Sequence, residues 1–196
     1  MKRLFDIIFS GIVLFCFLPL GLVIAIGILL ESRGGVFFMQ ERIGLNGIPF
    51  QLLKFRSMRV NAENSGKITV GARDPRITRI GFYLRKFKLD EFPQFLNVLK
   101  GEMSIVGPRP EVKEYVKLYT AEQRKILQVK PGITDYASLA YFHENELLAK
   151  SDHPQKTYVE EIMPAKIKLN EKYLSNPNLK QDLVIVWKTA TKIFRA

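Results

Sequence analysis

Two adjacent carboxylates, Asp90 and Glu91, lie near the start of residues 84–110, the segment that carries most of the candidate chemistry. Proline is tolerated in the first turn of a helix but not inside one, so Pro93 predicts a helix that begins near it and ends near Gly101. The two acids then lie at the N-terminus of this helix, where free N–H groups and the helix dipole favour negative charge. This pattern predicts a site for the carboxylates themselves or for a phosphate brought to them.

Cations lie on both sides of the acidic pair. Arg85 and two lysines precede it, and Arg109 follows between two prolines that restrict its backbone. A guanidinium presents a planar fork of donors that fits a phosphate, and a rigid backbone lowers the entropy that is lost on binding. An acidic pair beside basic residues is also typical of a solvated, self-neutralising surface. The number of special features within this short segment favours a reactive, phosphate-handling site.

The run LDEFPQFLNVLKGEMSIVGPRP, with KFRSM upstream and KPGIT downstream, resembles the bacterial sugar transferases, the monotopic phosphoglycosyl transferases that act on polyprenyl phosphate. The similarity extends over essentially the whole chain. It implies transfer of a sugar 1-phosphate from a UDP-sugar to undecaprenyl phosphate, through an aspartyl-phosphosugar intermediate on Asp90 and with release of UMP. It also implies the first membrane step of a bacterial glycoconjugate pathway that makes an O-antigen, capsule, exopolysaccharide or glycoprotein glycan.

That reaction gives each residue of the segment an expected role. Asp90 is expected to be the nucleophile, because a carboxylate with an ordinary pKa of about 3.9 is ionised at neutral pH without a general base. Glu91 is expected to bind metal or manage protons. Mg²⁺ held by Asp90 and Glu91 would bridge to the donor diphosphate and offset the charge on the leaving phosphate. By the resemblance, Lys54, Arg85 and Arg109 bind the substrate phosphates.

An apolar segment near the N-terminus predicts a membrane attachment. From Ile7 to Leu30, 24 residues carry no charge, and 17 of them are Leu, Ile, Val or Phe. As a straight helix this segment would reach about 36 Å, enough to span a hydrocarbon core of ~30 Å. It is also too long for the apolar region of a signal peptide.

Pro19 and the flanking charges predict that this segment is a re-entrant hairpin. Pro19 removes a helical hydrogen bond near the centre, and a hairpin keeps both basic flanks on one side of the membrane. The family that the chain resembles has such a helix-break-helix, often with Ser before the Pro, where this chain has Leu18. We therefore expect residues 1–33 to form a monotopic hairpin and residues 34–196 to form a catalytic domain on the cytoplasmic face of the bacterial inner membrane.

The remaining sequence predicts an α+β, mainly helical fold. Residues 36–56 alternate apolar and polar around Asn46-Gly47, a strong turn signal, and predict a β-hairpin. Residues 61–78 predict a loop, and residues 79–88 a short basic helix.

The C-terminal segment predicts an amphipathic helix that lies at the membrane interface. Asn178 is expected to cap this helix, and Trp187 lies on its apolar face beside lysines. A core helix of a soluble domain would show a similar pattern, but the apolar N-terminal segment favours the interface.

Composition sets limits on the partners. The net charge of +11 and the pI of about 9.8 favour anionic partners: phosphorylated substrates, anionic membrane lipids or nucleic acid. No nucleic-acid fold signature is present, so we expect no nucleic-acid partner. The single Cys16 excludes an internal disulfide, and His143 and His153 have no neighbours at metal-ligand spacing and are expected at the surface.

Two alternatives and two unexplained positions accompany this prediction. A membrane-anchored basic protein without enzymatic activity would explain the charge and the apolar segment, and a metal-dependent lipid diphosphate hydrolase would use the same acids differently. Residues 135–150 depart from the sequence of many relatives and are expected to contact the sugar or nucleotide. Asn170 stands where relatives carry an acid. The sequence leaves open the sugar, the exact acceptor, the pathway and whether the chain forms a homo-oligomer.

Overall fold

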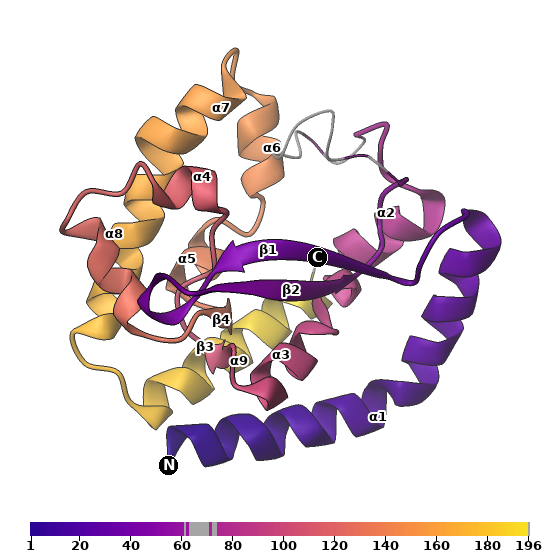
Figure 1. Ribbon diagram of the computed structural model, residues 1–196, viewed down its shortest axis with the longest axis horizontal. Helices are drawn as coiled ribbons and strands as arrows, with labels where there is room; N and C mark the ends of the chain where they lie inside the picture. The colour runs from indigo at the N-terminus through magenta and orange to yellow at the C-terminus, as the bar shows by residue number, and fades with distance from the viewer. Residues whose placement is uncertain (61, 63–70, 72–73, 196) are drawn as a thin grey trace.

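The computed structural model describes residues 1–60, 62, 71 and 74–195, and these form the mainly helical α+β fold that the sequence predicts (Figure 1). The strands pair as two small sheets, β1 with β2 and β3 with β4. The α-helices are α1 (Lys2–Glu31), α2 (Arg79–Lys86), α3 (Gln94–Lys100), α4 (Lys113–Val116), α5 (Tyr136–Ala140), α6 (Glu144–Ala149), α7 (Pro154–Thr157), α8 (Met163–Leu174) and α9 (Leu179–Phe194). The strands are β1 (Phe37–Ile43), β2 (Pro49–Phe55), β3 (Ser104–Val106) and β4 (Gly132–Thr134).

The apolar segment forms α1, which is one helix of 30 residues with Pro19 inside it. Figure 1 shows α1 as two limbs joined by a bend, the first beneath α3 and the second rising beside α2. An internal proline is a usual cause of such a bend. The structure thus has one continuous, bent helix where the sequence predicted a helix-break-helix. In the described part of the chain, α1 is the one helix long and apolar enough to cross a membrane.

Polar contacts fix the first limb of α1 to the globular part. The Arg3 guanidinium donates to the carbonyl oxygens of Val98 and Leu99 at the end of α3. The buried Asp6 carboxylate accepts hydrogen bonds from the Ser104 hydroxyl (2.9 Å) and from the Ile105 backbone N–H (3.1 Å). Because a buried carboxylate is costly unless it is hydrogen-bonded, these contacts fix the register of the limb against β3.

The far end of α1 is fixed to the same globular part. The buried Arg56 guanidinium donates to the carbonyl oxygens of Ser32 (2.7 Å) and Arg33 (2.6 Å), just beyond the last turn of the helix. The Glu31 carboxylate accepts from the backbone N–H groups of Arg79 and Ile80, the first residues of α2. Both ends of the apolar helix thus contact one domain.

The β-hairpin predicted for residues 36–56 is confirmed. β1 and β2 pair antiparallel, from Phe37 opposite Phe55 to Ile43 opposite Pro49. The turn between them is a short 3₁₀ segment, η1 (Leu45–Gly47), in which Asn46 has φ 56° and Gly47 has φ 79°. Asn and Gly are the residues that tolerate this left-handed conformation best.

The second sheet joins two turns that are distant in sequence. β3 and β4 pair in parallel, and Gly132 donates its N–H to the carbonyl oxygen of Pro108 (3.0 Å). A Cβ atom on Gly107 would lie 2.5 Å from the carbonyl oxygen of Lys130, so only glycine allows this approach. The strand at Gly132–Thr134 therefore depends on its tertiary pairing with β3.

The remaining expectations concern the loop at residues 61–78, the starts of two helices and the two histidines. Most of the loop predicted for residues 61–78 lies outside the described residues. α2 confirms the short basic helix, and its cap is Thr78, whose hydroxyl accepts from the Gly81 N–H (2.9 Å). Asn178 caps α9 as predicted, through the Gln181 N–H (2.9 Å). Both histidines are exposed, as expected.

Candidate active site

A tight turn between α2 and α3 positions the two acids. Lys88 ends the α2 region in the left-handed conformation, with φ 56°, and a 3₁₀ turn, η3 (Leu89–Glu91), follows directly. A left-handed lysine costs roughly 1 kcal/mol, so this turn is held by its surroundings. α3 then begins with Pro93 as its N-cap residue and ends at Gly101, close to the predicted limits. The turn directs Asp90 and Glu91 into different environments.

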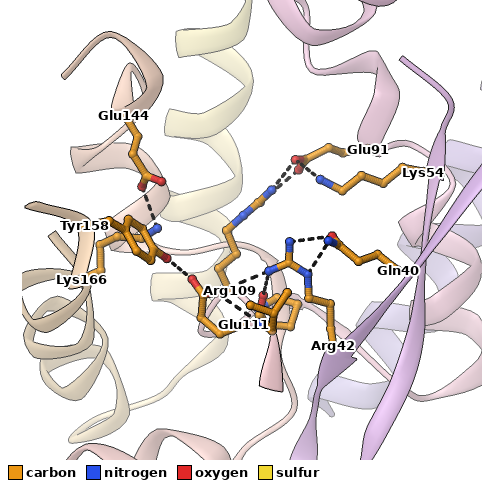
Figure 2. A network of polar contacts seen from close by, with 11 residues as sticks. Gln40, Arg42, Lys54, Glu91, Arg109, Glu111, Glu144, Tyr158 and Lys166 are labelled. Atoms are coloured by element: carbon orange, nitrogen blue, oxygen red, sulfur yellow. Dashed lines mark hydrogen bonds and ion pairs between the residues drawn. The ribbon is translucent and has the colours of Figure 1, made fainter. Parts of the chain in front are cut away.

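Glu91 is held by two of the predicted phosphate-binding residues. Figure 2 shows the Arg109 guanidinium donating to both carboxylate oxygens of Glu91, with Nη1–Oε2 at 3.1 Å and a closer contact between Nη2 and Oε1. The Lys54 ammonium, from β2, lies 3.2 Å from Oε1. Such a fork-to-fork pair is the strongest common form of ion pair in proteins. Glu91 therefore holds two cations beside the acidic turn.

The same contacts determine the charge state of Glu91. Burial raises the pKa of this carboxyl, but the charges of Arg109 and Lys54 outweigh burial and hold the pKa well below its ordinary value. Glu91 in turn raises the pKa of Arg109. Burial lowers the pKa of Lys54, although the Glu91 charge opposes this shift. Glu91 is thus a permanent anion at neutral pH.

Asp90 has the opposite environment. The residue is 5% exposed, and within the described residues no side chain or backbone N–H makes a hydrogen bond or ion pair with its carboxylate. Burial raises the pKa of Asp90; the Lys54 charge lowers it and the Glu91 charge raises it further. The pKa of Asp90 is therefore higher than the ordinary value expected from the sequence, because the sequence does not reveal burial.

Asp135 positions the backbone of Arg109 and was not predicted as a site residue. Its carboxylate accepts from the Arg109 N–H (3.1 Å) and also caps α5 through the Ser138 N–H. Asn170, on α8, donates to the same carboxylate (2.8 Å) and lines neither cavity described below. Asn170 is buried and positions the Asp135 carboxylate, which in turn holds the Arg109 backbone. The N-cap pattern at Asp135 was visible in the sequence, but its contact with Arg109 was not.

A second polar cluster lies on the other side of Arg109, between the hairpin and α8 (Figure 2). The Tyr158 hydroxyl donates to Glu111, and the Arg42 guanidinium lies 3.5 Å from the same carboxylate. Burial and the neighbouring Glu111 raise the pKa of Tyr158. Next to it, the Lys166 ammonium pairs with Glu144 at 2.8 Å. The sequence did not identify this cluster.

Two cavities share Asp90 in their walls. The first has a volume of about 410 Å³ and an apolar wall formed by α1, α3, α5 and α9. Phe9, Phe95, Leu139 and Val186 are among its lining residues. This cavity combines an apolar surface with a charged end.

The second cavity, of about 510 Å³, lies beside the β-hairpin. Its described lining includes eight basic side chains and three acidic ones, so it favours an anion. The basic residues are Arg42, Lys54, Arg56, Arg59, Arg76, Arg85, Arg109 and Lys166.

The structure brings the five predicted site residues together. Lys54, Arg85, Asp90 and Arg109 line both cavities, and Glu91 lines the first. Pro19, predicted as a membrane break, lines neither cavity. No group of three His, Cys, Asp or Glu side chains that could enclose a metal occurs among the residues that the structure describes.

Comparison with known proteins identifies relatives along the whole chain. Residues 1–196 match the family described as Bacterial sugar transferase. The chain is 38% identical over 198 residues to "UDP-N-acetylgalactosamine-undecaprenyl-phosphate N-acetylgalactosaminephosphotransferase" of Aeromonas hydrophila, covering 98% of this chain and 43% of that protein. It is 35% identical over 195 residues to "UDP-glucose:undecaprenyl-phosphate glucose-1-phosphate transferase" of Caulobacter vibrioides (strain ATCC 19089 / CIP 103742 / CB 15), covering 98% of this chain and 69% of that protein.

A third relative carries the same name as the Caulobacter protein. It comes from Escherichia coli (strain K12) and is 36% identical over 202 residues, covering 99% of this chain and 40% of that protein. The chain thus spans less than half the length of the Aeromonas and Escherichia relatives.

Proposed function

Because the chain belongs to the bacterial sugar transferase family, we propose that it moves a sugar 1-phosphate from a UDP-sugar to undecaprenyl phosphate. The observation that carries this proposal is the difference between the two acids. Asp90 is a buried carboxylate that no described residue pairs with, in the shared wall of two cavities, whereas cations bind both oxygens of Glu91. One acid is available for chemistry and the other organises the charges around it.

The first half-reaction uses Asp90 as the nucleophile. Its carboxylate oxygen bonds to the sugar-bearing phosphorus of the donor, while the bond from that phosphorus to the oxygen of UMP breaks. Arg109, Lys54 and Arg85 stabilise the negative charge of the diphosphate and of the departing UMP. Because Glu91 already holds Arg109 and Lys54 beside Asp90, these cations need little rearrangement to meet the donor. The basic cavity beside the hairpin is the proposed nucleotide site.

The second half-reaction transfers the sugar phosphate to the lipid. An oxygen of the acceptor phosphate bonds to the same phosphorus, the bond to the Asp90 oxygen breaks, and the free carboxylate is restored. The apolar cavity supports this step, because its wall includes α1 and α9 and ends at Asp90. A polyprenyl chain placed against this wall would bring its phosphate to the nucleophile. Two successive transfers let a water-soluble donor and a lipid acceptor use one site in turn.

Asp90 and Glu91 remain the candidate ligands for Mg²⁺. This ion is usually bound by one or two carboxylates together with substrate phosphates, so a site without a full protein cage still fits it. Asp90 lines both cavities and is bound by no cation among the described residues, whereas Glu91 would have to release Arg109 or Lys54 first. When bound, the ion would offset the charge that develops on the leaving phosphate.

We also propose that α1 enters and leaves the membrane by the cytoplasmic face. The support is that Arg3 and Asp6 at one end, and Glu31 and its neighbours at the other, contact the same domain. On α9, Trp187 is 71% exposed, which suits a helix at the interface. In a Cys16→Ser background, cysteines at positions 2 and 32 should both be shielded from an impermeant thiol reagent outside intact cells. Labelling of one position alone would rule out the hairpin.

The covalent step is tested with donor alone. Enzyme, UDP-sugar and Mg²⁺ without acceptor should release about one UMP per enzyme and leave a sugar-phosphate adduct on the peptide that contains Asp90. Asp90→Asn should abolish both, because an amide cannot replace the anionic nucleophile. Unmodified enzyme, together with kinetics that require a ternary complex, would remove Asp90 from this role. Release of UMP with free sugar phosphate and no adduct would favour the hydrolase alternative.

A further inference from the structure

The proposed reaction requires groups that bind the sugar, and the phosphate-binding residues do not supply them. The nucleotide is present only in the first half-reaction, and the lipid only in the second. The sugar phosphate is present in both, attached first to UMP, then to Asp90 and finally to the lipid. Groups that bind the sugar must therefore be reachable from both the basic cavity and the apolar cavity. This inference rests on the proposed function.

Few residues satisfy this geometric condition. In the described part of the chain, seven residues line both cavities: Lys54, Arg85, Asp90, Arg109, Glu144, Asn145 and Lys166. The first four are the nucleophile and the phosphate-binding cations. Glu144, Asn145 and Lys166 remain, and none of them has a role in the phosphate chemistry. They come from α6 and α8, opposite the elements that carry the nucleophile.

The three residues form a polar wall of limited accessibility. The Lys166 ammonium lies 2.8 Å from the Glu144 carboxylate, and their side chains are 12% and 25% exposed. Lys166 also lies over the Tyr158 ring, 5.6 Å from its centroid, and Tyr158 is fixed by its hydrogen bond to Glu111. Figure 2 shows Glu144 and Lys166 facing each other on their own pair of helices, away from Glu91. This packing restricts the positions of both charged groups before any ligand binds.

We propose that Glu144, Asn145 and Lys166 bind the sugar ring of the donor and select which UDP-sugar is used. A carboxylate accepts hydrogen bonds from sugar hydroxyls, an ammonium donates to them, and an amide does both. The paired charges cancel, so the wall suits a neutral hexose or N-acetylhexosamine better than a uronic acid. A site built to bond a hydroxyl rejects an analogue that lacks it, because its own polar groups are then left unpaired.

The competing explanation is that the Glu144–Lys166 pair only ties α6 to α8. Such a structural tie predicts that losing the pair lowers activity with every donor alike. Sugar recognition predicts that the relative rates with different donors change. The ratio of kcat/KM between two UDP-sugars therefore separates the two explanations, because a general loss of folded enzyme cancels in the ratio.

The experiment measures UMP release with UDP-glucose, UDP-galactose, UDP-N-acetylglucosamine, UDP-N-acetylgalactosamine and UDP-glucuronic acid. We expect Glu144→Gln and Lys166→Met each to lower the preference of the wild type for its best donor at least tenfold. The charge-swapped variant Glu144→Lys/Lys166→Glu keeps an ion pair and should also alter the preference. Glu160→Gln and Lys156→Met, from an exposed pair outside both cavities, are the matched controls and should leave it unchanged.

The second half-reaction gives an independent readout. Transfer of the preferred sugar phosphate from the Asp90 adduct to the lipid should also slow in the Glu144 and Lys166 variants, since the sugar still occupies the wall. Unchanged donor preference in all three variants would overturn the inference while leaving the proposed function intact. A wild-type enzyme that releases UMP from no UDP-sugar in the panel and forms no adduct would instead contradict the proposed function itself.

Discussion

Asp90 and Glu91 are neighbours in the chain, yet their environments differ in almost every physical respect. Glu91 lies among cations, and they hold its pKa well below the ordinary value. Asp90 is buried and makes no hydrogen bond or ion pair with any residue that the structure describes, and burial raises its pKa. Pairs of carboxyl groups whose pKa values are pushed apart commonly divide the work of an active site. The turn at Lys88 thus places two adjacent carboxylates in opposite electrostatic environments, which is the difference that the proposed division of roles rests on.

The largest expected loss of rate follows from replacing Glu91, and it tests whether Glu91 holds the two cations in place for the reaction. Glu91→Gln removes the anion that holds Arg109 and Lys54, so the first half-reaction should slow by about 100-fold. The adduct should still form on Asp90, because the nucleophile is intact. The measurement is single-turnover UMP release followed by mass spectrometry. An Asp90 adduct that never appears in this variant would mean that Glu91 takes part in the bond-making step.

Stability should respond to the two acids with opposite signs. Glu91→Gln leaves two partly buried cations uncompensated and should lower the free energy of unfolding by about 2 kcal/mol. Asp90→Asn removes an unpaired buried charge and should raise it by about 1 kcal/mol. Thermal unfolding in detergent at pH 7 measures both. If the two variants shift the midpoint in the same direction, the contrast between the two environments is wrong.

The fork of Arg109 should matter more than its charge. Arg109→Lys keeps a cation but loses the planar pair of donors, so kcat/KM should fall at least tenfold, equivalent to about 1.4 kcal/mol. The exposed Arg124→Lys is a matched control, because it lies outside both cavities. Unchanged kinetics in the Arg109 variant would leave this arginine with the structural role of holding Glu91.

The smallest expected effect is on the pH dependence of the first half-reaction. Asp90 must be ionised to attack, so kcat/KM should fall as the pH drops through a pKa above the ordinary aspartate value. Lys54→Met should move this acidic limb to higher pH, because the Lys54 charge lowers the pKa of Asp90. UMP release without acceptor is the suitable measurement, since the acceptor phosphate titrates itself near pH 6. A limb that moves to lower pH would contradict the assignment.

The same pKa directions predict how pH affects stability. The Glu91 pKa is lower in the folded state, so its stabilising contribution is present above its ordinary pKa and is lost as the pH falls toward the folded value. The Asp90 pKa is raised, so the folded state binds that proton more tightly and loses stability as the pH rises through the folded pKa. Glu91→Gln should abolish the first dependence and Asp90→Asn the second.

Local sequence signals determined many features of the fold. Asn46 and Gly47 fixed the hairpin turn because few residues tolerate its left-handed backbone. Pro93 and Gly101 fixed the limits of α3, and Asn178 the start of α9. The apolar run from Ile7 onward forms α1, because a helix satisfies the backbone hydrogen bonds of a long uncharged segment within the segment itself. These features follow from interactions over a few residues, which a sequence displays directly.

Tertiary structure alone decided how the two acids differ. The spacing of residues 84–110 identified Asp90, Glu91 and Arg109 but could not show that Arg109 would bind Glu91 and not Asp90. Burial and unlike charges set both pKa shifts, and these depend on which elements pack around the turn. The contact of Asp135 with Arg109 likewise spans 26 positions and required the pairing of β3 with β4.

The sequence by itself determined the candidate reactive groups and the apolar helix, because residue type fixes the available chemistry and local pattern fixes the helix. Only the tertiary structure determined the two cavities and the wall that they share. Glu144 and Lys166 come from separate helices and meet at 2.8 Å because α6 packs near α8, a contact over 22 positions that no local pattern encodes. The physical reason is that hydrogen bonding within a helix acts over four residues, whereas a cavity is formed by side chains from elements distant in sequence.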